Sequence, residues 1–185
     1  NPVVGFRIVT SGDAIEVDWN TLEAATFANP TPIPLNVSKA ADVLTYPTSG
    51  NYAGSLGTLY AEVFPISAIA NYPVIGDTGT GAMPLFLSGA VTFNSFDGAN
   101  TAAQGPSNAV LNALNKVGES RSGAAHRTFT AGLIGADATY SSYTPSSLGI
   151  GTFNSGAQAF WGAIRNVRIF STPLPAGQLS AMTTP

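Results

Sequence analysis

The chain of 185 residues contains no cysteine, so disulfides, thiolate metal sites and cysteine nucleophiles are excluded. Charged side chains are also scarce, at 9% of the residues against about a quarter in ordinary globular domains. With seven basic residues and a net charge of −3, the chain lacks the basic stripe that nucleic-acid binding requires. No apolar run approaches the ~18 residues of a membrane-spanning helix. We therefore expect neither nucleic acid nor membrane insertion.

Aromatic residues are plentiful, with ten Phe, six Tyr and two Trp, and they exclude a disordered chain. The length is sufficient for one domain with its own core. A surface with so few charges repels itself weakly and does not oppose association. We expect an assembly subunit, with a plain secreted monomer as the alternative. The chain begins at Asn1 without Met, and we expect it to be processed or trimmed from a longer one.

Residues 1–36 are predicted to form a strand-rich arm that ends in a proline-rich connector. The arm has predicted strands at 3–10 and 13–19. In the second strand, apolar and acidic residues alternate with period two: Ile15, Val17 and Trp19 on one face, Glu16 and Asp18 on the other. Pro30, Pro32 and Pro34 then exclude a central strand, because proline cannot donate to a sheet ladder. We place the domain boundary there, with the main domain at 37–185.

The main domain is predicted to be all-β. Turn residues separate a series of short strands, predicted at 42–46, 57–64, 73–75, 82–87, 90–96, 127–132, 148–153 and 160–170. Such a series is typical of an antiparallel sandwich or barrel. Helical spacing of apolar residues predicts one helix over 107–118, and a short C-terminal helix is expected over 175–182.

Two of these strands indicate which residues face the core. In 57–64, Leu59, Ala61 and Val63 share one face, as expected of a sandwich strand. In 160–170, the apolar residues change phase between Ile164 and Val167. Either a bulge shifts the register there, or both faces of the strand are buried.

The run Gly162-Ala163-Ile164-Arg165-Asn166-Val167-Arg168-Ile169-Phe170 and the tail 171–179 resemble the closing strand and tail of concanavalin A-like (laminin-G-like) jelly-roll domains. Residues 41–44 and 57–63 resemble the opening strands of the versions found in bacteriophage tail and virion proteins. Phe170 and Gln178 depart from the family's usual tyrosine and acid, and the family's usual strand pair is not evident between 130 and 142. The resemblance implies an antiparallel jelly-roll sandwich on the surface of a virion.

Catalytic signals are weak. The run Glu16-Val17-Asp18-Trp19-Asn20 resembles the acidic strand of β-glucanases that share this jelly roll, but Asn20 stands where the third carboxylate would be. His126 is the single histidine, and the sequence has no G-x-S-x-G elbow that would place a nucleophile beside it. We therefore expect no enzymatic activity, with a polysaccharide-degrading enzyme as the third possibility.

Two sets of loop residues are candidates for ligand binding. Asp77, Asp97 and Asn100 supply oxygen atoms of the kind that a rim Ca²⁺ requires in concanavalin A-like domains. Two carboxylates make a weak site, however, and Asp and Asn in turns usually serve only the turn; no other cofactor is expected. Tyrosines beside polar groups suit the stacking of a sugar ring, or the covering of a sheet edge; these are Tyr52, Tyr72, Tyr140 and Tyr143.

Together these features predict a non-enzymatic adhesion module, such as a tail fibre, spike or head-decoration protein, that contacts host-surface glycan. The alternative is a purely structural capsid or tail protein that binds its neighbours only. We expect the chain to self-associate, as a trimer, because the phage fibres and spikes that it resembles are commonly trimeric. We also expect contacts to other virion proteins. The arm at 1–36 is suited to add a strand to the sheet edge of a neighbour.

Overall fold

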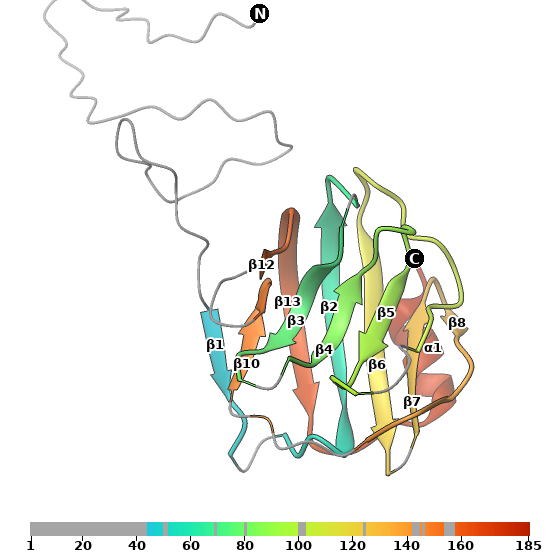
Figure 1. Cartoon of the computed structure of the whole chain (residues 1–185). Coiled ribbons are helices and arrows are strands. Elements are labelled where there is room, and N and C mark those ends of the chain that lie inside the picture. The colour runs from blue at the N-terminus through green and yellow to red at the C-terminus, as the bar shows by residue number, and fades with distance from the viewer. Residues whose placement is uncertain are drawn as a thin grey trace, which may run out of the picture. The chain divides into compact units, whose positions relative to one another are not determined.

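The protein is represented by a computed structural model that describes residues 44–185, apart from 50–51, 69, 80, 100–102, 124, 142–144, 146 and 154–157. The described residues form a compact β-sandwich with one helix near the C-terminus (Figure 1). The strands expected at 3–10 and 13–19 and the boundary after residue 36 lie outside the described residues. Among the described residues, no helix is both long and apolar enough to span a membrane.

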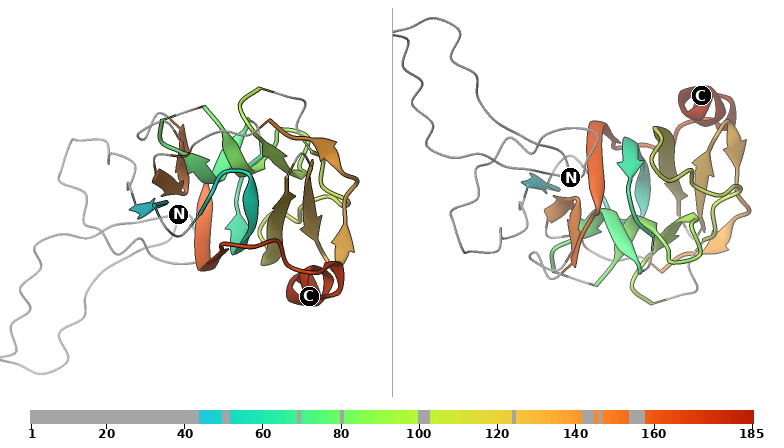
Figure 2. Two further views of the ribbon diagram at one scale, coloured as in Figure 1. Left: turned by 90° about the horizontal axis from the view of Figure 1, so that it is seen from below. Right: turned by 90° about the horizontal axis from the view of Figure 1, so that it is seen from above.

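Two antiparallel sheets form the two layers of the sandwich (Figure 2). The first has five strands in the order β1 (Leu44–Pro47), β10 (Ser147–Ile150), β3 (Tyr72–Asp77), β4 (Met83–Leu87) and β5 (Phe93–Phe96). The second runs β13 (Gly162–Phe170), β2 (Leu56–Pro65), β6 (Asn115–Ser122), β7 (Ala125–Thr130) and β8 (Leu133–Ile134), with β9 (Ala138–Thr139) also paired to β7. The fold is thus the all-β sandwich that the strand pattern predicts.

Three small elements complete the fold. The hairpin of β11 (Thr152–Phe153) and β12 (Gln158–Ala159) is attached to β3 through Gly151, whose N–H donates to the carbonyl of Val74 at 2.8 Å. Helix α1 (Ala176–Thr183) packs on β6, β7 and β8 and buries Leu179. This helix confirms the one expected over 175–182. It covers part of the outer face of the second sheet, and the rest of that face carries the charged groups described below.

In β2, apolar side chains at alternate positions face the core. Leu59, Ala61 and Val63 are fully buried and pack with residues of the first sheet, including Val74, Leu85, Leu87, Phe93 and Leu148. Glu62 and Phe64 have the opposite phase and are half-buried on the outer face. The predicted inner face of this strand is therefore confirmed.

The prediction of a helix over 107–118 is wrong. Residues 107–114 form a loop, and β6 begins at Asn115 in the middle of the second sheet. Four apolar residues suggested a helix, and three of them are exposed: Val110, Leu111 and Leu114. The fourth, Val117, is buried in β6. The Asn115 carboxamide holds this loop, because it accepts from the Val110 N–H and donates to the Val110 carbonyl, both at 2.8 Å. A side-chain clamp therefore replaces helical hydrogen bonds.

Smaller corrections concern element boundaries. The strand expected at 148–153 is divided at Gly151, which has φ of 69° and turns the chain from β10 into β11. The phase change in 160–170 is a bulge between Arg165 and Arg168, with Asn166 at φ of 49°. The strand expected at 90–96 begins only at Phe93, because residues 88–92 form a turn in which the Ser88 N–H donates to the carbonyl of Thr92.

Candidate functional site

The tyrosines expected to bind sugar are largely buried where they are described. Tyr52, Tyr140 and Tyr72 are 4%, 5% and 8% exposed, and Tyr143 lies outside the described residues. The rings of Tyr52 and Tyr140 lie 5.7 and 4.7 Å from the guanidinium carbon of Arg121. These two rings pack on an internal cation, and neither offers an open face to a sugar.

The expected calcium ligands Asp77 and Asp97 hold turns. Asp77 Oδ1 accepts from the Gly79 N–H at 2.7 Å, and Asp97 Oδ1 accepts from the Ala99 N–H at 2.9 Å. The second oxygen of Asp97 accepts from the Ser141 N–H at 2.6 Å, and Asn100 lies outside the described residues. In the described part of the chain, no three His, Asp or Glu side chains gather in a way that could hold a metal ion. Both aspartates are thus in the turn-forming role that the sequence analysis gave as the alternative.

A polar cluster fills the interior between β5, β6 and β7. The register places Arg121 opposite His126, and Glu119 two residues earlier faces the same way. Arg121 Nε donates to Glu119 Oε1, and Arg121 Nη1 donates to the Tyr140 hydroxyl at 2.8 Å. Ser95 on β5 lies across the interior with its Oγ 3.2 Å from Glu119 Oε1 and 2.9 Å from His126 Nδ1. All except Tyr140 are at most 1% exposed.

The cluster brings together a serine, a histidine and a carboxylate, but their connections differ from those of a hydrolase. In a catalytic triad the histidine accepts from the serine and donates from its other nitrogen to the carboxylate. Here Ser95 itself reaches Glu119, and His126 Nε2 has no hydrogen-bond partner among the described residues. If the Ser95 proton goes to Glu119, His126 Nδ1 must be the donor to Ser95. These groups are sealed from solvent and form a buried hydrogen-bonded cluster.

Burial governs the charges in this cluster. It lowers the pKa of His126 to about 4, and the neighbouring Arg121 guanidinium acts in the same direction. Burial raises the pKa of Glu119, against the opposing attraction of Arg121. His126 is therefore neutral at physiological pH.

The outer face of the second sheet carries an exposed charged cluster centred on Glu62. Arg165 Nε donates to Glu62 Oε2 at 2.8 Å, and Asn166 Nδ2 donates to Oε1 at 2.9 Å. The hydroxyl of Tyr60 also reaches Oε1, at 3.3 Å. Hydrogen bonds from Asn166 and Arg165 lower the pKa of Glu62. The bulge in β13 makes this possible, because the left-handed Asn166 places both donors beside one carboxylate.

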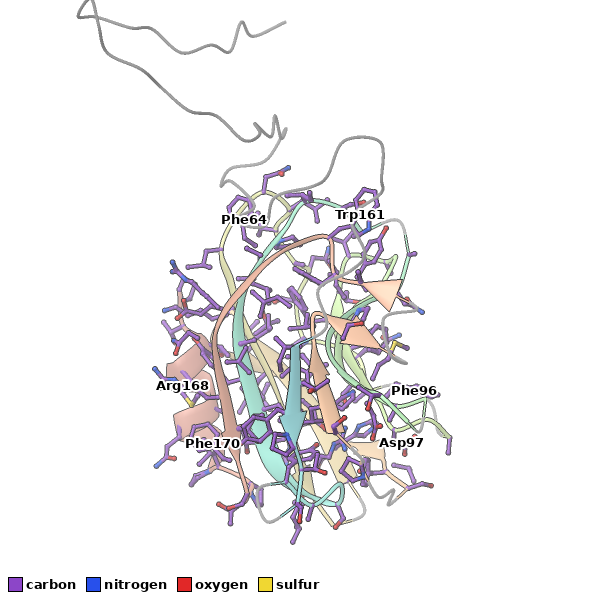
Figure 3. All side chains as sticks on the ribbon, turned by 90° about the vertical axis from the view of Figure 1, so that its left-hand side faces the viewer. Phe64, Phe96, Asp97, Trp161, Arg168 and Phe170 are labelled. Atoms are coloured by element: carbon purple, nitrogen blue, oxygen red, sulfur yellow. The ribbon has the colours of Figure 1, made fainter. Side chains whose placement is uncertain are left out.

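Three further cations of the described residues lie on the same sheet face, of which Arg168 is exposed and Lys116 and Arg127 are half-buried. Arg168 lies over the Tyr60 ring at 5.8 Å, and Lys116 is opposite Glu62 across β2 and β6. Arg127 on β7 pairs with Asp137 at 2.8 Å. Burial and then Glu62 raise the pKa of Tyr60 to about 12, so this hydroxyl stays protonated. Figure 3 shows Arg168 and Phe170 on one side of the sandwich, with Phe96 and Asp97 on the other.

Trp161, between β12 and β13, is 54% exposed and stacks on Tyr72 of the first sheet. The ring centroids are 6.2 Å apart and the ring planes differ by 22°. The next residue, Gly162, has φ of 152°, and a Cβ there would collide with the Phe64 carbonyl. Only glycine fits, so the turn that presents Trp161 is fixed by the backbone.

Exposed apolar residues continue from Trp161 along this end of the sandwich. The Ile66 N–H donates to the Trp161 carbonyl at 3.0 Å, and the Asn112 N–H donates to the Pro65 carbonyl at 2.8 Å. These bonds fasten the Trp161 turn and the 107–114 loop to the end of β2. Asn71, exposed beside Tyr72, adds a polar group. We call Trp161, Tyr72, Ile66 and Asn71 the aromatic rim.

The sequence analysis found only part of this rim. It selected Tyr72 because a tyrosine follows an asparagine in a loop, but it missed Trp161, which presents the exposed ring. The signal was the pair Phe160-Trp161 before a glycine: Phe160 packs against the core while the adjacent Trp161 is exposed. Side chains of successive residues in extended chain point to opposite sides. Of two adjacent aromatic residues before a strand, one is therefore expected to face solvent.

No family model and no curated protein matches the chain. Solved structures do match. The CBM40 module of Ruminococcus gnavus IT-sialidase is 16% identical, with a TM-score of 0.57 over 72% of this chain and 85% of that one. Domain 4 of a GH43 extracellular arabinanase from Geobacillus stearothermophilus, solved with arabinotriose, is 14% identical, with a TM-score of 0.60 over 77% of this chain and 72% of that one.

A third similar structure is the heptameric SAP-like pentraxin of Limulus polyphemus, which is 12% identical with a TM-score of 0.56 over 72% of each chain. At such identities the likeness shows the fold alone. The main domain is therefore a concanavalin A-like jelly-roll sandwich, as the closing-strand resemblance implied.

Proposed function

We propose that this domain binds carbohydrate without cleaving it and acts as an adhesion module on the surface of a bacteriophage particle. The aromatic rim is the observation that carries the proposal. A sugar ring stacks its C–H face on an aromatic plane, while its hydroxyls bond to nearby amides. Trp161 offers such a plane, Tyr72 stacks on it, and Asn71, next to Tyr72 in the chain, supplies an exposed amide.

The similar structures give this proposal its first probes. One of them is the same CBM40 module bound to α2,3-sialyllactose, and another is the arabinanase domain with arabinotriose. We would test those two sugars and an array of bacterial surface oligosaccharides against the full chain. Trp161→Ala should weaken binding about tenfold or more, since the stacking surface is lost.

The matched control is Leu133→Ala. Leu133 is 53% exposed, almost as much as Trp161, but lies on β8 at the opposite edge of the second sheet. It should leave sugar binding unchanged. If no sugar binds, or if Trp161→Ala binds as well as the natural chain, the proposal fails.

The non-catalytic part of the proposal has its own test. The exposed groups at the aromatic rim include no pair of carboxylates that could act as acid and nucleophile. The acidic residues Glu16 and Asp18 lie outside the described part of the chain. We expect no hydrolysis of bacterial polysaccharide in a reducing-end assay. Hydrolysis that Glu16→Gln or Asp18→Asn abolishes would show that the domain is an enzyme.

A purely structural role in a capsid or tail is the second candidate function. It is favoured by the low charge of the chain and by the long edge strand β13, which carries partly buried apolar residues on its inner face. The location of the aromatic rim in an intact particle separates the two functions. A rim that faces solvent fits adhesion, and a rim covered by a neighbour fits a structural role.

A further inference from the structure

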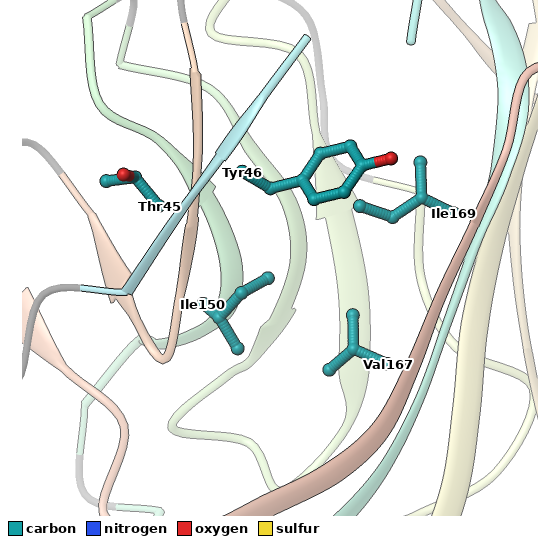
Figure 4. A pocket seen from close by; sticks show the side chains of 5 residues that line it. All are labelled: Thr45, Tyr46, Ile150, Val167 and Ile169. Carbon is teal, nitrogen blue, oxygen red and sulfur yellow. The ribbon is translucent and has the colours of Figure 1, made fainter. Parts of the chain in front are cut away.

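The open side of the sandwich lies between the two edge strands β1 and β13. An apolar pocket of about 360 Å³ separates them, lined by Thr45 and Tyr46 of β1, Ile150 of β10, and Val167 and Ile169 of β13 (Figure 4). Tyr46, Ile150, Val167 and Ile169 are all only partly buried, although each packs against the hydrophobic core. The pocket is therefore a gap in the apolar interior that opens at the sheet edges.

The two edges differ in their capacity to accept another strand. β1 has four residues and ends in Pro47, and a short edge with proline is a poor template. β13 has nine residues without proline, and among the described residues only β2 pairs with it. Its outward backbone groups are available to a further strand.

Charge is divided unequally between the two parts of the chain. Residues 1–43 hold five acidic and two basic side chains, so they account for the whole net charge of −3. Residues 44–185 hold five of each, and the exposed cations Arg165 and Arg168 lie on the outer face of β13 itself. Glu62 balances only one of these two arginines.

The segment 13–19 has the pattern that this edge requires. Its sequence alternates apolar Ile15, Val17 and Trp19 with acidic Glu16 and Asp18. A strand added beside β13 would place one of these sets on the inner face, toward the pocket, and the other on the outer face, beside the arginines. Apolar side chains would then fill the gap between β1 and β13, and carboxylates would meet Arg165 and Arg168.

We propose that residues 13–19 of a second copy of this chain add as a strand to the free edge of β13 and fill the apolar pocket between β1 and β13. Because each copy has one such segment and one such edge, exchange among identical chains closes into a dimer or a ring. This interaction is independent of sugar binding at the aromatic rim. It names the acceptor for the arm that the sequence analysis expected to join a neighbour.

A charge swap in the full-length chain tests the proposal by sedimentation velocity over a range of concentrations. The arm variant Glu16→Arg/Asp18→Arg and the edge variant Arg165→Glu/Arg168→Glu should each self-associate about tenfold more weakly, or worse, because contacts between opposite charges become contacts between like charges. A chain that carries all four changes should recover association. Arg127→Glu, on the same sheet face but on β7, is the matched control and should associate like the natural chain.

The proposal is overturned if the natural chain stays monomeric at every concentration. It is also overturned if the chain with all four changes self-associates no more strongly than the arm variant. If the edge variant does not fold, the arm variant alone still decides, since it alters no residue of the sandwich. Trp161→Phe adds a second measurement, because it leaves Trp19 as the single tryptophan. Its fluorescence should shift to the blue as the chain associates, and an unchanged spectrum in an associated sample contradicts the strand addition.

Discussion

The interior of this sandwich has two unlike halves. Toward β1, β3, β4 and β10 the buried side chains are aliphatic and aromatic, as in Val63, Leu85 and Leu148. Toward β5, β6 and β7, charged and polar side chains join Phe93 and Val117, and Glu119 and Arg121 are among the largest fully buried residues. The same two sheets enclose both. An inner sheet face must therefore be filled and hydrogen-bonded, but it need not be apolar.

The difference lies in how each half tolerates change. Apolar packing is a sum of many weak contacts, so losses are local and accumulate. A buried ion pair depends on its partners, because either charge left alone in the interior is strongly disfavoured. The predictions below test this contrast, beginning with the largest expected effect.

Arg121→Met should lower the free energy of unfolding by about 3–5 kcal/mol, because it leaves the Glu119 carboxylate buried without its cation. Urea denaturation monitored by circular dichroism measures the loss. The double variant Glu119→Leu/Arg121→Met should recover most of it, since no charge remains to be buried. A double variant as unstable as Arg121→Met would show that the two halves do not differ in this way.

Leu85→Ala in the apolar half should cost about 3 kcal/mol, from lost burial and the cavity left behind. Here a second truncation brings no recovery. Leu59→Ala, also fully buried, should cost a similar amount, and the double variant should be less stable than either single variant. Urea unfolding of the three variants provides the comparison, and cancellation between the two leucines would contradict it.

The polar half should also make stability depend on pH. Since the pKa of His126 is lowered to about 4 in the folded protein, the unfolded chain takes up a proton first as the pH falls below about 6.5. Stability should fall between pH 6.5 and 4, by up to about 3 kcal/mol, and this contribution should level off below. His126→Gln should flatten that part of the profile. An unchanged slope in the variant would assign the pH dependence to other groups.

The smallest expected effect concerns Asp77 and Asp97. Both hold turns through backbone N–H groups, so removal of calcium by EDTA should change the melting temperature by no more than about 2 °C. Differential scanning calorimetry with and without added Ca²⁺ measures this. A larger shift that calcium reverses would show that these carboxylates hold the ion, because a ligand bound to the native state stabilises it.

The sequence predicts the strands of the apolar half and also β5 and β7 of the polar half, but not β6. Strands β2, β3 and β4 were predicted because their inward positions are apolar, so period two is visible in the sequence. β6 was missed because its inward positions include Glu119 and Arg121, residue types that usually indicate solvent. Its burial follows from partners elsewhere in the chain, Ser95 on β5 and Tyr140 after β9, which no local pattern reveals.

The candidate sites show the same limit. Glu62 and Arg165 pair across 103 residues, and only the register of β2 against β13 brings them together. The change of phase near Asn166 did signal a bulge, but not that the bulge would gather donors around one carboxylate. Tyr72 was selected from its loop, whereas the exposure of Trp161 depends on the turn at Gly162.

The pairing of β2 with β13 sets the order in which this domain can be completed. Leu59 of β2 lies opposite Ile169 of β13. During synthesis β2 therefore cannot pair with β13 until roughly 110 further residues have been made. Such long-range pairing slows folding, because the intervening loop must close before the contacts form. Until the ribosome has released residues 162–170, the outer edge of β2 has no partner and can pair with another chain. Premature termination before β13 should therefore yield aggregates rather than a smaller folded domain.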